Sequence, residues 1–583
     1  MEMDRIVGLI ERGLWDDALD KYVNYIDSAH MDEKAYIVGA TIMEHYEKYG
    51  TMFDFIMEGL KIAPCNYELY LLLGNYYRYS KNNIDQAYLS YENAMWHCLK
   101  EARNENDISE IEKLIKDLEK NEMISTRNVS IVILSYNTLE YTKICIESIR
   151  DTCYDGCCEI IVVDNASDDG SIEWLREQKD IVLIENSENT GFPAGCNNGI
   201  KAADQENDIL LLNNDTIMLP NSLYWLRIGL YENEDIGSAG AVTNYASNDQ
   251  IAGGQYETIE EYISYGTGVN IPMVNPYELK LYLVMFATLI KREALNKVGL
   301  LDELFSPGNF EDNDYGIRLL ENGYKSILCH NSYIFHFGSK SFGKNRESYY
   351  ERLKINRNKF KDKWGFYDDY YTHVRSDIIA MMNPPENKHI KVLEIGCGLG
   401  ETLAKIGYLF PGAEVHGIEL VDTIASIGNN RFDIRCGDIE NMELDDDELY
   451  DYVIFADVLE HLRYPEDVLV RMRKHLTECG YVLTSIPNVM NAGVIKELLA
   501  GNFTYRDAGI LDRTHLRFFT LNEIRRMFQR AGYDIDQLST TVLPEESTKA
   551  HKDFFDRLID IDGVASRELF DIYQFVIKAS PCI

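Results

Sequence analysis

Short apolar runs that end in Asn or Asp recur through the middle third of the chain. One of them, 209–212, follows Asp208, is apolar on both faces and is too short for a helix. It predicts a buried strand that breaks at once into Asn213-Asn214-Asp215. Segments with helical spacing separate similar runs at 129–134, 159–163 and 181–184. Strands that alternate with helices predict an α/β domain with a mainly parallel sheet and right-handed crossovers.

The polar residues after these strands are candidate ligand contacts. In an open α/β sheet, ligands bind beyond the carboxyl ends of the strands. Asp215 would therefore lie where a hard cation can be held together with two phosphates. The alternative is a strand followed by an ordinary turn, because Asn and Asp are common turn residues. The repetition of this pattern at several strand ends favours a ligand site.

The first 122 residues have the spacing of paired helices. Pro64 precedes two antiparallel helical segments in which small residues sit where helices would cross and aromatic residues fill the gaps. The pattern consists of Tyr70, Leu73, Gly74, Tyr77, Ala87, Tyr91 and Ala94. It resembles the tetratricopeptide repeat, with one residue more than usual before Ala87. The resemblance implies a module that binds a protein partner, and the alternative is a plain helical cap on the next domain.

A different glycine-rich pattern opens the last third of the chain. A predicted strand, a tight glycine turn and a helix start occupy 391–400, and a second strand at 414–418 ends in Glu419. A carboxylate at that position can accept two ribose hydroxyls. The glycine spacing differs from that of dinucleotide-binding folds, and Glu394 just before the turn suits an amine or a sulfonium. The segment 571–578 alternates and predicts a further strand.

Composition narrows the possible partners. With 583 residues the chain is long enough for roughly three or four domains. Its net charge of −39 and the lack of a basic tract argue against nucleic acid as the main partner. No apolar run approaches the ~18 residues needed to cross a bilayer, and no signal segment opens the chain. The 12 cysteines, of which only Cys153, Cys157 and Cys158 cluster, are expected to be free thiols in the cytoplasm.

The middle third resembles the inverting glycosyltransferases of family 2, which have the GT-A fold, and within them the rhamnosyltransferase-like members of bacterial surface-glycan pathways. The matching segments are 134–137, 163–170, 189–192, 212–215 and 310–314. The resemblance implies a nucleotide-sugar site formed by Ser135, Asn137, Asp164, Asn165, Gly191, Asn213, Asn214 and Asp215. In that reading Asp164 binds the ring N–H of the base, and Ser135 to Asn137 line the base and ribose.

The same resemblance implies a divalent cation, Mg²⁺ or Mn²⁺, on Asp215 and His336. Asp215 would be the last residue of the family's DxD motif, in which Asn213 replaces the first Asp here. One carboxylate fewer should weaken the metal site. For His336, flanked by aromatic residues, the alternative is simple packing in the core.

A helix that begins after Phe310 carries the residues expected to act on the acceptor. A sugar hydroxyl is a poor nucleophile, so its attack needs a general base. By resemblance this base is Asp312, with Glu311 and Asp314 orienting it or contacting the acceptor. The alternative is structural, because acids in a first helical turn are favoured by the helix dipole.

The last third resembles the class I S-adenosylmethionine methyltransferases, in the branch of small-molecule O-methyltransferases. The matching segments are 394–400, 437–439, 457–462 and 512–520. The resemblance implies a cofactor site formed by Glu394, Gly396, Gly398, Gly400, Glu419, Asp438, Ile439 and Asp457. Asp438 would face the adenine, and Gly396 and Gly398 would let the backbone approach the methionine part. The resemblance also implies that the strand at 571–578 is an antiparallel edge strand.

Asp457, Glu460 and His461 are spaced so that they share one face of a helical turn. Such a trio can hold a divalent cation that orients a hydroxyl, or His461 can act as a base. The alternative is a helix start with favourable acids. His515, paired with Arg517, is a second candidate near the acceptor.

These patterns together predict a multidomain α/β enzyme. The expected parts are a helical repeat-like module at 1–122, a GT-A domain at 128–345, a helical linker at 346–385 and a Rossmann-like methyltransferase domain at 386–583. We expect transfer of a sugar with inversion from a nucleotide donor, rhamnose by resemblance, to a glycan or glycoprotein such as flagellin. The last domain would methylate a sugar hydroxyl, in the cytoplasm beside a surface-glycan assembly complex. The alternative is a methyltransferase whose inactive glycosyltransferase-like domain only holds the acceptor.

Overall fold

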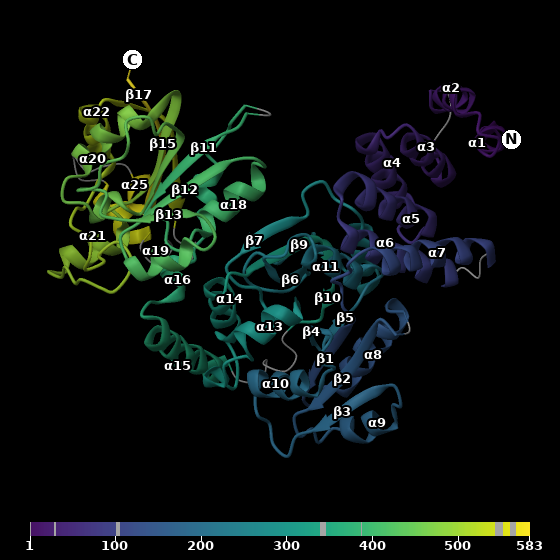
Figure 1. Cartoon of the computed structure of the whole chain (residues 1–583). Helices are drawn as coiled ribbons and strands as arrows, with labels where there is room; N and C mark the ends of the chain where they lie inside the picture. Colours follow the sequence, from purple (N-terminus) through teal and green to yellow (C-terminus); the bar gives the residue numbers. More distant parts are fainter. Residues whose placement is uncertain are drawn as a thin grey trace. The chain divides into compact units, whose positions relative to one another are not determined.

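The computed structural model describes residues 2–27, 31–100, 105–154, 156–338, 346–385, 388–542, 552–559 and 567–582. It divides into two compact units, Met1–Phe366 and Tyr367–Ile583 (Figure 1). The first unit contains the helical module and the predicted sugar-transfer domain, and the second contains the predicted methyltransferase domain. The predicted boundaries at 345 and 386 fall outside the described residues.

The amino-terminal module consists of helices α1 to α7. They span Glu2–Ile10, Trp15–Ile26, Glu33–His45, Tyr49–Ile62, Tyr67–Tyr76, Ile84–Lys100 and Glu105–Asn121. The predicted close crossing of α5 and α6 is present, because a methyl group on Gly74 would lie 2.3 Å from the Tyr91 ring. The extra residue before Ala87 is accommodated by a π-helical turn at Tyr77–Lys81, which ends at Asn82 in the left-handed region.

An eight-stranded sheet forms the centre of the sugar-transfer domain, in the order β3-β2-β1-β4-β8-β6-β9-β7. The strands β1 to β4 are parallel and span Val129–Ser135, Cys158–Asp164, Ile181–Glu185 and Asp208–Asn213. The remaining strands of the sheet are β6 (Ile236–Val242), β7 (Tyr277–Lys280), β8 (Ala287–Ile290) and β9 (Lys325–Tyr333). A small second sheet pairs β5 (Thr216–Ile217) with β10 (Phe335–His336). The four predicted parallel strands are thus confirmed.

Helices cover both faces of this sheet because its strands are apolar on both sides. On one face, α8 (Leu139–Thr152) and α11 (Ser222–Leu230) share a continuous apolar core with α5 and α6. On the other face lie α10 (Phe192–Ala202), α13 (Arg292–Val298) and α14 (Glu311–Glu321). The remaining helices are α9 (Ser171–Glu177), α12 (Ile259–Val269) and the 3-10 turn Glu303–Phe305.

The helical module is bound tightly to the sugar-transfer domain. Gln86 donates to the carbonyl of Ile228 at 3.0 Å, and the Ser90 hydroxyl lies 2.8 Å from that of Tyr224. Asn221 donates to the carbonyl of Pro64 at 2.8 Å. This face of α6 therefore has the role of a cap, and any partner surface must lie on other helices.

The expected linker at 346–385 is not a separate element. The helix α15 (Arg346–Trp364) belongs to the first unit, where Trp364 donates from its indole nitrogen to Asp314 at 3.0 Å. Residues from Tyr367 onward belong to the second unit, with Ile378 and Met381 in its core. The linker prediction differed because the helical pattern of α15 continues directly into the short helices α16 (Asp368–Tyr371) and α17 (Ser376–Ile379).

The second unit is built on a seven-stranded sheet in the order β13-β12-β11-β14-β15-β17-β16. Its strands β11 to β17 span Lys391–Ile395, Glu414–Glu419, Asp433–Cys436, Tyr450–Ala456, Leu476–Pro487, Tyr533–Val542 and Ile572–Pro581. Its longer helices are α18 (Glu401–Leu409), α19 (Asp422–Gly428), α20 (Pro465–Met472), α21 (Ala492–Leu499), α22 (Leu521–Ala531) and α24 (Lys552–Leu558). A short helix, α25 (Glu568–Asp571), directly precedes β17.

The last strand is antiparallel as predicted, but the prediction that it lies at the edge is wrong. β17 pairs with β15 on one side and with β16 on the other, so β16 forms the edge. This agrees with the burial of the strands, because β17 is largely buried while β16 is mostly exposed.

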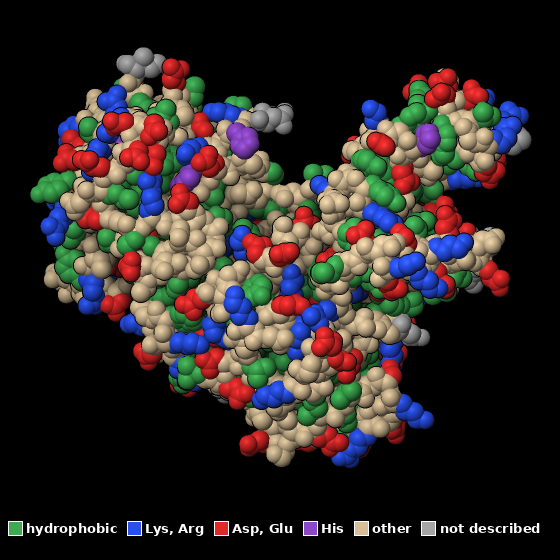
Figure 2. Space-filling view, viewed as in Figure 1, with side chains coloured by type: hydrophobic (Ala, Val, Ile, Leu, Met, Phe, Trp, Pro, Cys, Tyr) green, Lys and Arg blue, Asp and Glu red, His purple; other side chains and the backbone are tan. Residues whose placement is uncertain are grey.

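Among the described residues, no helix is both long enough and apolar enough to span a bilayer. Figure 2 shows acidic and basic side chains interspersed over the visible face, without a large basic patch.

Candidate active sites

The polar residues at the ends of β1, β2 and β4 meet at one edge of the first sheet. Ser135 is in register with Asp164, and Leu134 is in register with Asn213. Because the three strands are parallel neighbours, their carboxyl ends present these side chains together. The sequence prediction of a shared edge is therefore confirmed.

Asp164 is prepared to accept a hydrogen bond from a ligand. It is fully buried, and its Oδ1 accepts from the backbone nitrogen of Ser167 at 2.8 Å. Its Oδ2 is buried without any hydrogen-bond partner. Leaving such an oxygen unpaired costs about 1–3 kcal/mol. A donor on a ligand is the group that this oxygen lacks.

Several predicted nucleotide contacts hold the protein together instead. The side chains of Ser135 and Asn214 both hydrogen-bond to Thr142 on α8, at 3.1 and 2.8 Å. Asn165 is 1% exposed, and its amide connects the loops around Asn186 and Gly191. These three side chains shape the site, and the Ser135 hydroxyl, the Asn214 amide nitrogen and the Asn165 amide are already hydrogen-bonded inside the protein.

Two predicted residues lie in the loops at the mouth of this edge. Asn137 is exposed and accepts from the backbone nitrogen of Asp168 at 2.8 Å, so it joins the loops after β1 and β2. Gly191 has a φ of +81°, and a methyl group there would lie 2.6 Å from the Cα atom of Pro307. Only glycine fits both the left-handed backbone and this close approach. It brings the loop before α10 against the loop before α14.

Asp215 and His336 lie together beside the predicted nucleotide site. His336 Nε2 is 3.1 Å from Asp215 Oδ1, and its Nδ1 is 2.8 Å from the carbonyl oxygen of Tyr245. A neutral imidazole that donates from Nδ1 has only a lone pair on Nε2. That lone pair would face a carboxylate oxygen, so a proton or a cation between the two atoms is needed to make the contact favourable.

This pair fits the divalent cation that the sequence predicts. It combines a carboxylate oxygen with an imidazole nitrogen whose other nitrogen is fixed by a carbonyl, as in many metal sites. Asn213 is half-buried, and its side-chain nitrogen lies 3.5 Å from His336 Nε2. Two strong ligands leave room for oxygens of a diphosphate.

Sequence reasoning missed the residues that hold His336 in place. Asn244 exchanges two hydrogen bonds with the backbone of His336, both of 2.9 Å, and the ring of Phe286 stacks on the imidazole at 5.4 Å. Asn244 opens a segment of mostly polar residues, 244–250, which by itself indicates only a loop. Its pairing with β10 depends on a contact 92 residues away in the chain, which no local pattern reveals.

Glu311 and Asp312 begin α14 on the other side of the loop containing Pro307. Glu311 is buried, its Oε2 has no hydrogen-bond partner, and burial together with the charge of Asp312 raises its pKa well above the ordinary value. The raised pKa favours the protonated form of Glu311, while Asp312 beside it is half-buried. This is the arrangement in which one of two adjacent acids stays neutral.

Asp314 has a structural role. Its carboxylate is fully buried and accepts from Arg318 at 2.8 Å and from Trp364 at 3.0 Å. It joins α14 to α15 and offers no exposed oxygen to an acceptor. Tyr349, also on α15, lies within electrostatic reach of both Tyr245 and Asp312, whose charges add to the effect of burial in raising its pKa. Tyr349 therefore lies near both the loop that holds His336 and the start of α14, which carries Asp312.

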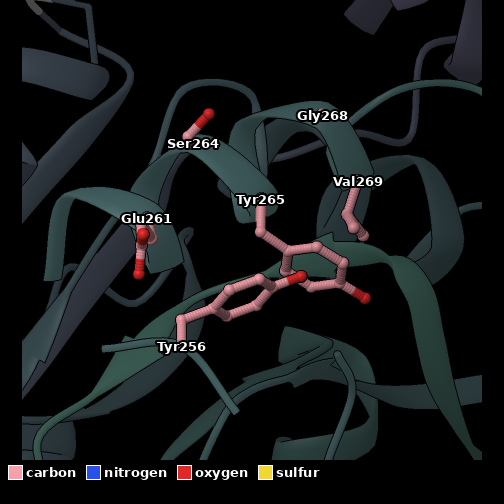
Figure 3. A pocket seen from close by; sticks show the side chains of 6 residues that line it. All are labelled: Tyr256, Glu261, Ser264, Tyr265, Gly268 and Val269. Carbon is pink, nitrogen blue, oxygen red and sulfur yellow. The ribbon is translucent and has the colours of Figure 1, made fainter. Parts of the chain in front are cut away.

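A hollow of about 540 Å³ lies on α12 in the same unit. Figure 3 shows the rings of Tyr256 and Tyr265 against each other there, with ring centres 5.4 Å apart. The hollow lies close to the strand that carries His336, because Tyr262 of α12 packs on Phe335 at 5.4 Å.

In the second unit, the glycine turn after β11 follows the prediction. Gly396, Gly398 and Gly400 have φ values of +69°, +55° and +86°. A methyl group on Gly398 would lie 2.7 Å from the carbonyl oxygen of Tyr371, so the turn is closed by the segment that leads into this unit. Gly398 also donates to Glu419 at 3.0 Å, which fixes the carboxylate at the end of β12.

Glu394 is buried beside this turn with one oxygen unpaired. Its Oε2 has no hydrogen-bond partner, and burial raises its pKa to about 8, against the opposing effects of Arg375 and Thr402. Arg375, which sequence reasoning missed, pairs with Asp377 at 2.7 Å and with Asp457 at 2.6 Å. A lone arginine before a short helix carries no motif that would have identified it.

The predicted trio of Asp457, Glu460 and His461 does not form. Asp457 has a φ of +54° and lies before a 3-10 turn, Leu459–His461, instead of on one helical face. Besides Arg375, its carboxylate binds Ser485 at 2.6 Å and Gln574 at 2.7 Å. The spacing argument assumed an α-helix at this position, and the left-handed residue breaks that geometry.

Glu460, His461 and His515 come together instead. Each offers one ligand atom, and these atoms lie within 4.8 Å of one another. Both oxygens of Glu460 are buried and unpaired, and burial raises its pKa well above the ordinary value. Burial and the neighbouring His515 lower the pKa of His461, so its imidazole is neutral near pH 7. Arg517 donates instead to the carbonyl of Arg463 and does not pair with His515.

The remaining predicted cofactor residues lie in the turn after β13. Asp438 is half-buried and accepts from the backbone nitrogen of Glu440 at 2.9 Å, so its carboxylate closes this turn. Ile439 is 4% exposed and packs in the core. Across the described residues, the buried unpaired carboxylate oxygens belong to four acids, Asp164, Glu311, Glu394 and Glu460. All four lie in the two predicted sites.

Comparison with known families gives two matches. Residues 130–299 match the model for glycosyl transferase family 2, and residues 367–538 match a model for a methyltransferase domain. Two curated relatives are malonyl-[acyl-carrier protein] O-methyltransferases, from Bacillus cytotoxicus (34% identity, 16% of this chain and 35% of the relative) and Bacillus anthracis (24%, 31% and 68%). A ubiquinone biosynthesis O-methyltransferase from Rickettsia akari is 24% identical over 28% of this chain and 68% of the relative.

Solved structures with partial likeness include a mannosyltransferase from Pyrobaculum calidifontis in complex with GDP-Man and Mn²⁺. It is 15% identical, with a TM-score of 0.32 over 49% of this chain and 71% of that chain. A methyltransferase dependent on S-adenosylmethionine (SAM) from Archaeoglobus fulgidus is 18% identical, with a TM-score of 0.25 over 40% and 99%.

Proposed function

Because this chain joins a family 2 glycosyltransferase domain to a methyltransferase domain, we propose that it is a bifunctional transferase. The first activity moves a sugar, with inversion, from a nucleotide sugar to a hydroxyl of a glycan or glycoprotein. The second moves a methyl group from S-adenosylmethionine to a sugar hydroxyl. The observation that carries this proposal is the placement of the four unpaired buried carboxylates in the two sites.

In sugar transfer, Asp164 accepts from the base of the donor, and Asp312 accepts the proton of the acceptor hydroxyl. As that proton leaves, the acceptor oxygen bonds to the anomeric carbon and the bond to the nucleoside diphosphate breaks. Glu311, whose raised pKa favours its protonated form, would donate a hydrogen bond to a bound ligand instead of competing as a base. Asp215 and His336 would hold a divalent cation, which stabilises the charge of the leaving diphosphate.

In methyl transfer, the glycine turn and Glu419 position the cofactor, and Glu394 faces its positive charge. His461 is neutral near pH 7 and accepts the proton of the acceptor hydroxyl as the oxygen–methyl bond forms and the sulfur–methyl bond breaks. Much of the rate comes from alignment of the two reactants. The relatives described above are O-methyltransferases, which supports oxygen as the methyl acceptor.

For the donor we propose a thymidine diphosphate rhamnose, in keeping with the sequence resemblance. For the acceptor, the two tyrosines of the hollow on α12 are suited to stack on a sugar ring, and Ser264 and Glu261 supply polar contacts (Figure 3). The enzyme would act in the cytoplasm during assembly of a surface glycan. A partner protein would contact the amino-terminal module on surfaces away from the face of α6 that packs on the sugar-transfer domain.

The alternative is that the first domain only holds the acceptor, since Asn213 replaces one carboxylate. Titration of thymidine diphosphate and uridine diphosphate by calorimetry, with and without Mn²⁺, separates the two. Our proposal predicts binding of one diphosphate that tightens with Mn²⁺ and is lost in Asp164→Asn. Absence of binding to either diphosphate, with methyl transfer intact, would support the acceptor-holding role.

We further propose that both groups are added to one product, because joined sites raise the local concentration of an intermediate. Incubation with acceptor and both donors, followed by mass spectrometry, tests this. Sugar and methyl on the same molecule are expected, and separate products would refute it.

A further inference from the structure

Three cysteines gather in a part of the first unit that neither proposed reaction uses. Cys153 follows the end of α8, and Cys157 and Cys158 lead into β2. Their sulfur atoms all lie within 4.8 Å of one another. Cys153 and Cys157 are buried, and Cys158 is half-buried.

We propose that Cys153, Cys157 and Cys158 bind a thiophilic cation, Zn²⁺. Three sulfurs that each lie ~2.3 Å from one zinc are ~3.8 Å apart, which is compatible with the observed clustering. A single disulfide would pair only two of the three and leave the third unused. The half-exposed Cys158 leaves the fourth position of a tetrahedral site open to water.

The surroundings balance the charge of such a site. Zn²⁺ with three thiolates carries one net negative charge. Arg227 is 5% exposed, lies 3.4 Å from the Tyr154 hydroxyl within the same loop, and interacts electrostatically with Cys157. A buried guanidinium beside the thiolates offsets the cost of burying a negative cluster.

The position of the cluster points to a structural role, separate from the sugar-transfer site. Cys158 is the first residue of β2 and Asp164 is its last, so the two ends are ~20 Å apart along the strand. Tyr154 in the same loop packs on Trp96 of α6, with ring centres 6.1 Å apart. Arg227 also reaches Glu92 of α6 at 3.2 Å. The metal would therefore brace the contact between the helical module and the sheet.

The test uses the full chain expressed with added Zn²⁺ and dialysed against metal-free buffer. Metal analysis should find one zinc per chain in the wild type and in Cys436→Ser/Cys479→Ser, which changes two exposed cysteines. Cys153→Ser/Cys157→Ser should lose that zinc. Replacement by Co²⁺ should give the sulfur-to-cobalt charge-transfer band in the wild type but not in this variant.

Two measurements keep the proposal falsifiable if the variant is unstable. Far-ultraviolet circular dichroism and the thermal unfolding of the first unit report whether the variant is folded there. Cys158→Ser alone should weaken zinc retention without changing the circular dichroism spectrum. His461→Ala/His515→Ala should retain the zinc, which separates this site from the histidine cluster. Zinc absent from the wild type, zinc retained in Cys153→Ser/Cys157→Ser, or a disulfide between two of these cysteines in freshly isolated protein would overturn the proposal.

Discussion

The two active sites leave buried carboxylates unpaired in different electrostatic settings. In the glycosyltransferase domain, the supporting side chains are neutral: Asn165, next to Asp164, bonds to the loop at Gly191, and Asn214 bonds to Thr142 on α8. In the methyltransferase domain, a cation, Arg375, braces Asp457 and lies near Glu394. Under the proposed function, the first site takes an anionic donor together with a divalent cation held by Asp215 and His336, and the second takes a cationic cofactor that faces Glu394. The unpaired carboxylate oxygens, more than the residues that brace them, are then the groups that the ligands would contact.

The largest difference between the two sites is expected when the proposed base of sugar transfer is removed. Asp312→Asn should lower the rate of sugar transfer by about 10³-fold, because the hydroxyl loses its proton acceptor. Release of nucleoside diphosphate measures this rate. Methyl transfer should stay within twofold of wild type, and Glu173→Gln, which changes an exposed acid on α9, should leave both rates unchanged. Sugar transfer at a normal rate in Asp312→Asn would remove the proposed role of this residue.

The corresponding change in the second site should have a smaller effect. His461→Ala should lower methyl transfer by about 10²-fold with unchanged affinity for S-adenosylmethionine, since alignment still supplies part of the rate. Radiolabelled methyl incorporation measures the rate, and calorimetry measures the affinity. His389→Ala, an exposed histidine before β11, is the matched control. A loss of cofactor affinity without loss of rate would assign His461 to binding instead.

Glu394 allows the charge argument itself to be tested through pH. Because its pKa is raised to about 8, the folded protein holds a proton that a cationic cofactor must displace. Affinity for S-adenosylmethionine should therefore rise as pH increases toward about 8, with proton release on binding. Calorimetry in buffers of different ionisation enthalpy detects that release. Glu394→Gln should bind about tenfold more weakly, with no such pH dependence.

The same shift has a consequence for stability without cofactor. The native state holds the Glu394 proton between about 4.5 and about 8, whereas the unfolded chain releases it. The free energy of unfolding of this unit should therefore fall as pH rises through that range. Denaturant titration of wild type and Glu394→Gln at several pH values isolates this contribution. Equal slopes in both proteins would show that Glu394 does not titrate in this way.

The last expected effect, no larger than that of Glu394→Gln on cofactor binding, concerns the metal ligands of the first site. His336→Gln should raise the Mn²⁺ concentration for half-maximal sugar transfer by roughly tenfold, because Asp215 and the diphosphate still bind the ion. Mn²⁺ titration of the transfer rate measures the change. An unaltered Mn²⁺ requirement would leave His336 as a packed core residue.

Much of this architecture could be predicted from sequence because its signals are local. The strands ending in Asn or Asp and the glycine turn at 396–400 depend on neighbours in the chain, and they appear where predicted. The errors arose where contacts between residues far apart in the sequence determine the local conformation. Asp457 is held by Arg375, Ser485 and Gln574, which lie 28 to 117 residues away, so its spacing to Glu460 was misleading.

Residues that brace the sites were the hardest to foresee. Asn244 and Phe286 carry no motif, and their role follows only from their contacts with His336. His515 was predicted as an acceptor-side residue, but its place beside Glu460 required the segment after α21 to fold back onto the turn Leu459–His461, where the backbone nitrogen of Leu516 donates to the carbonyl of Glu460. Conversely, Ser135 and Asn214 matched the glycosyltransferase motifs, but their side chains hydrogen-bond to Thr142 instead of facing a ligand freely.

The most direct test titrates thymidine diphosphate with Mn²⁺ and S-adenosylmethionine into the same preparations of wild type, Asp164→Asn and Glu394→Gln. We expect wild type to bind one molecule of each ligand. Asp164→Asn should lose or weaken only the nucleotide, and Glu394→Gln should weaken only the cofactor. If both ligands bind unchanged in both variants, the unpaired buried carboxylates do not mark the ligand sites.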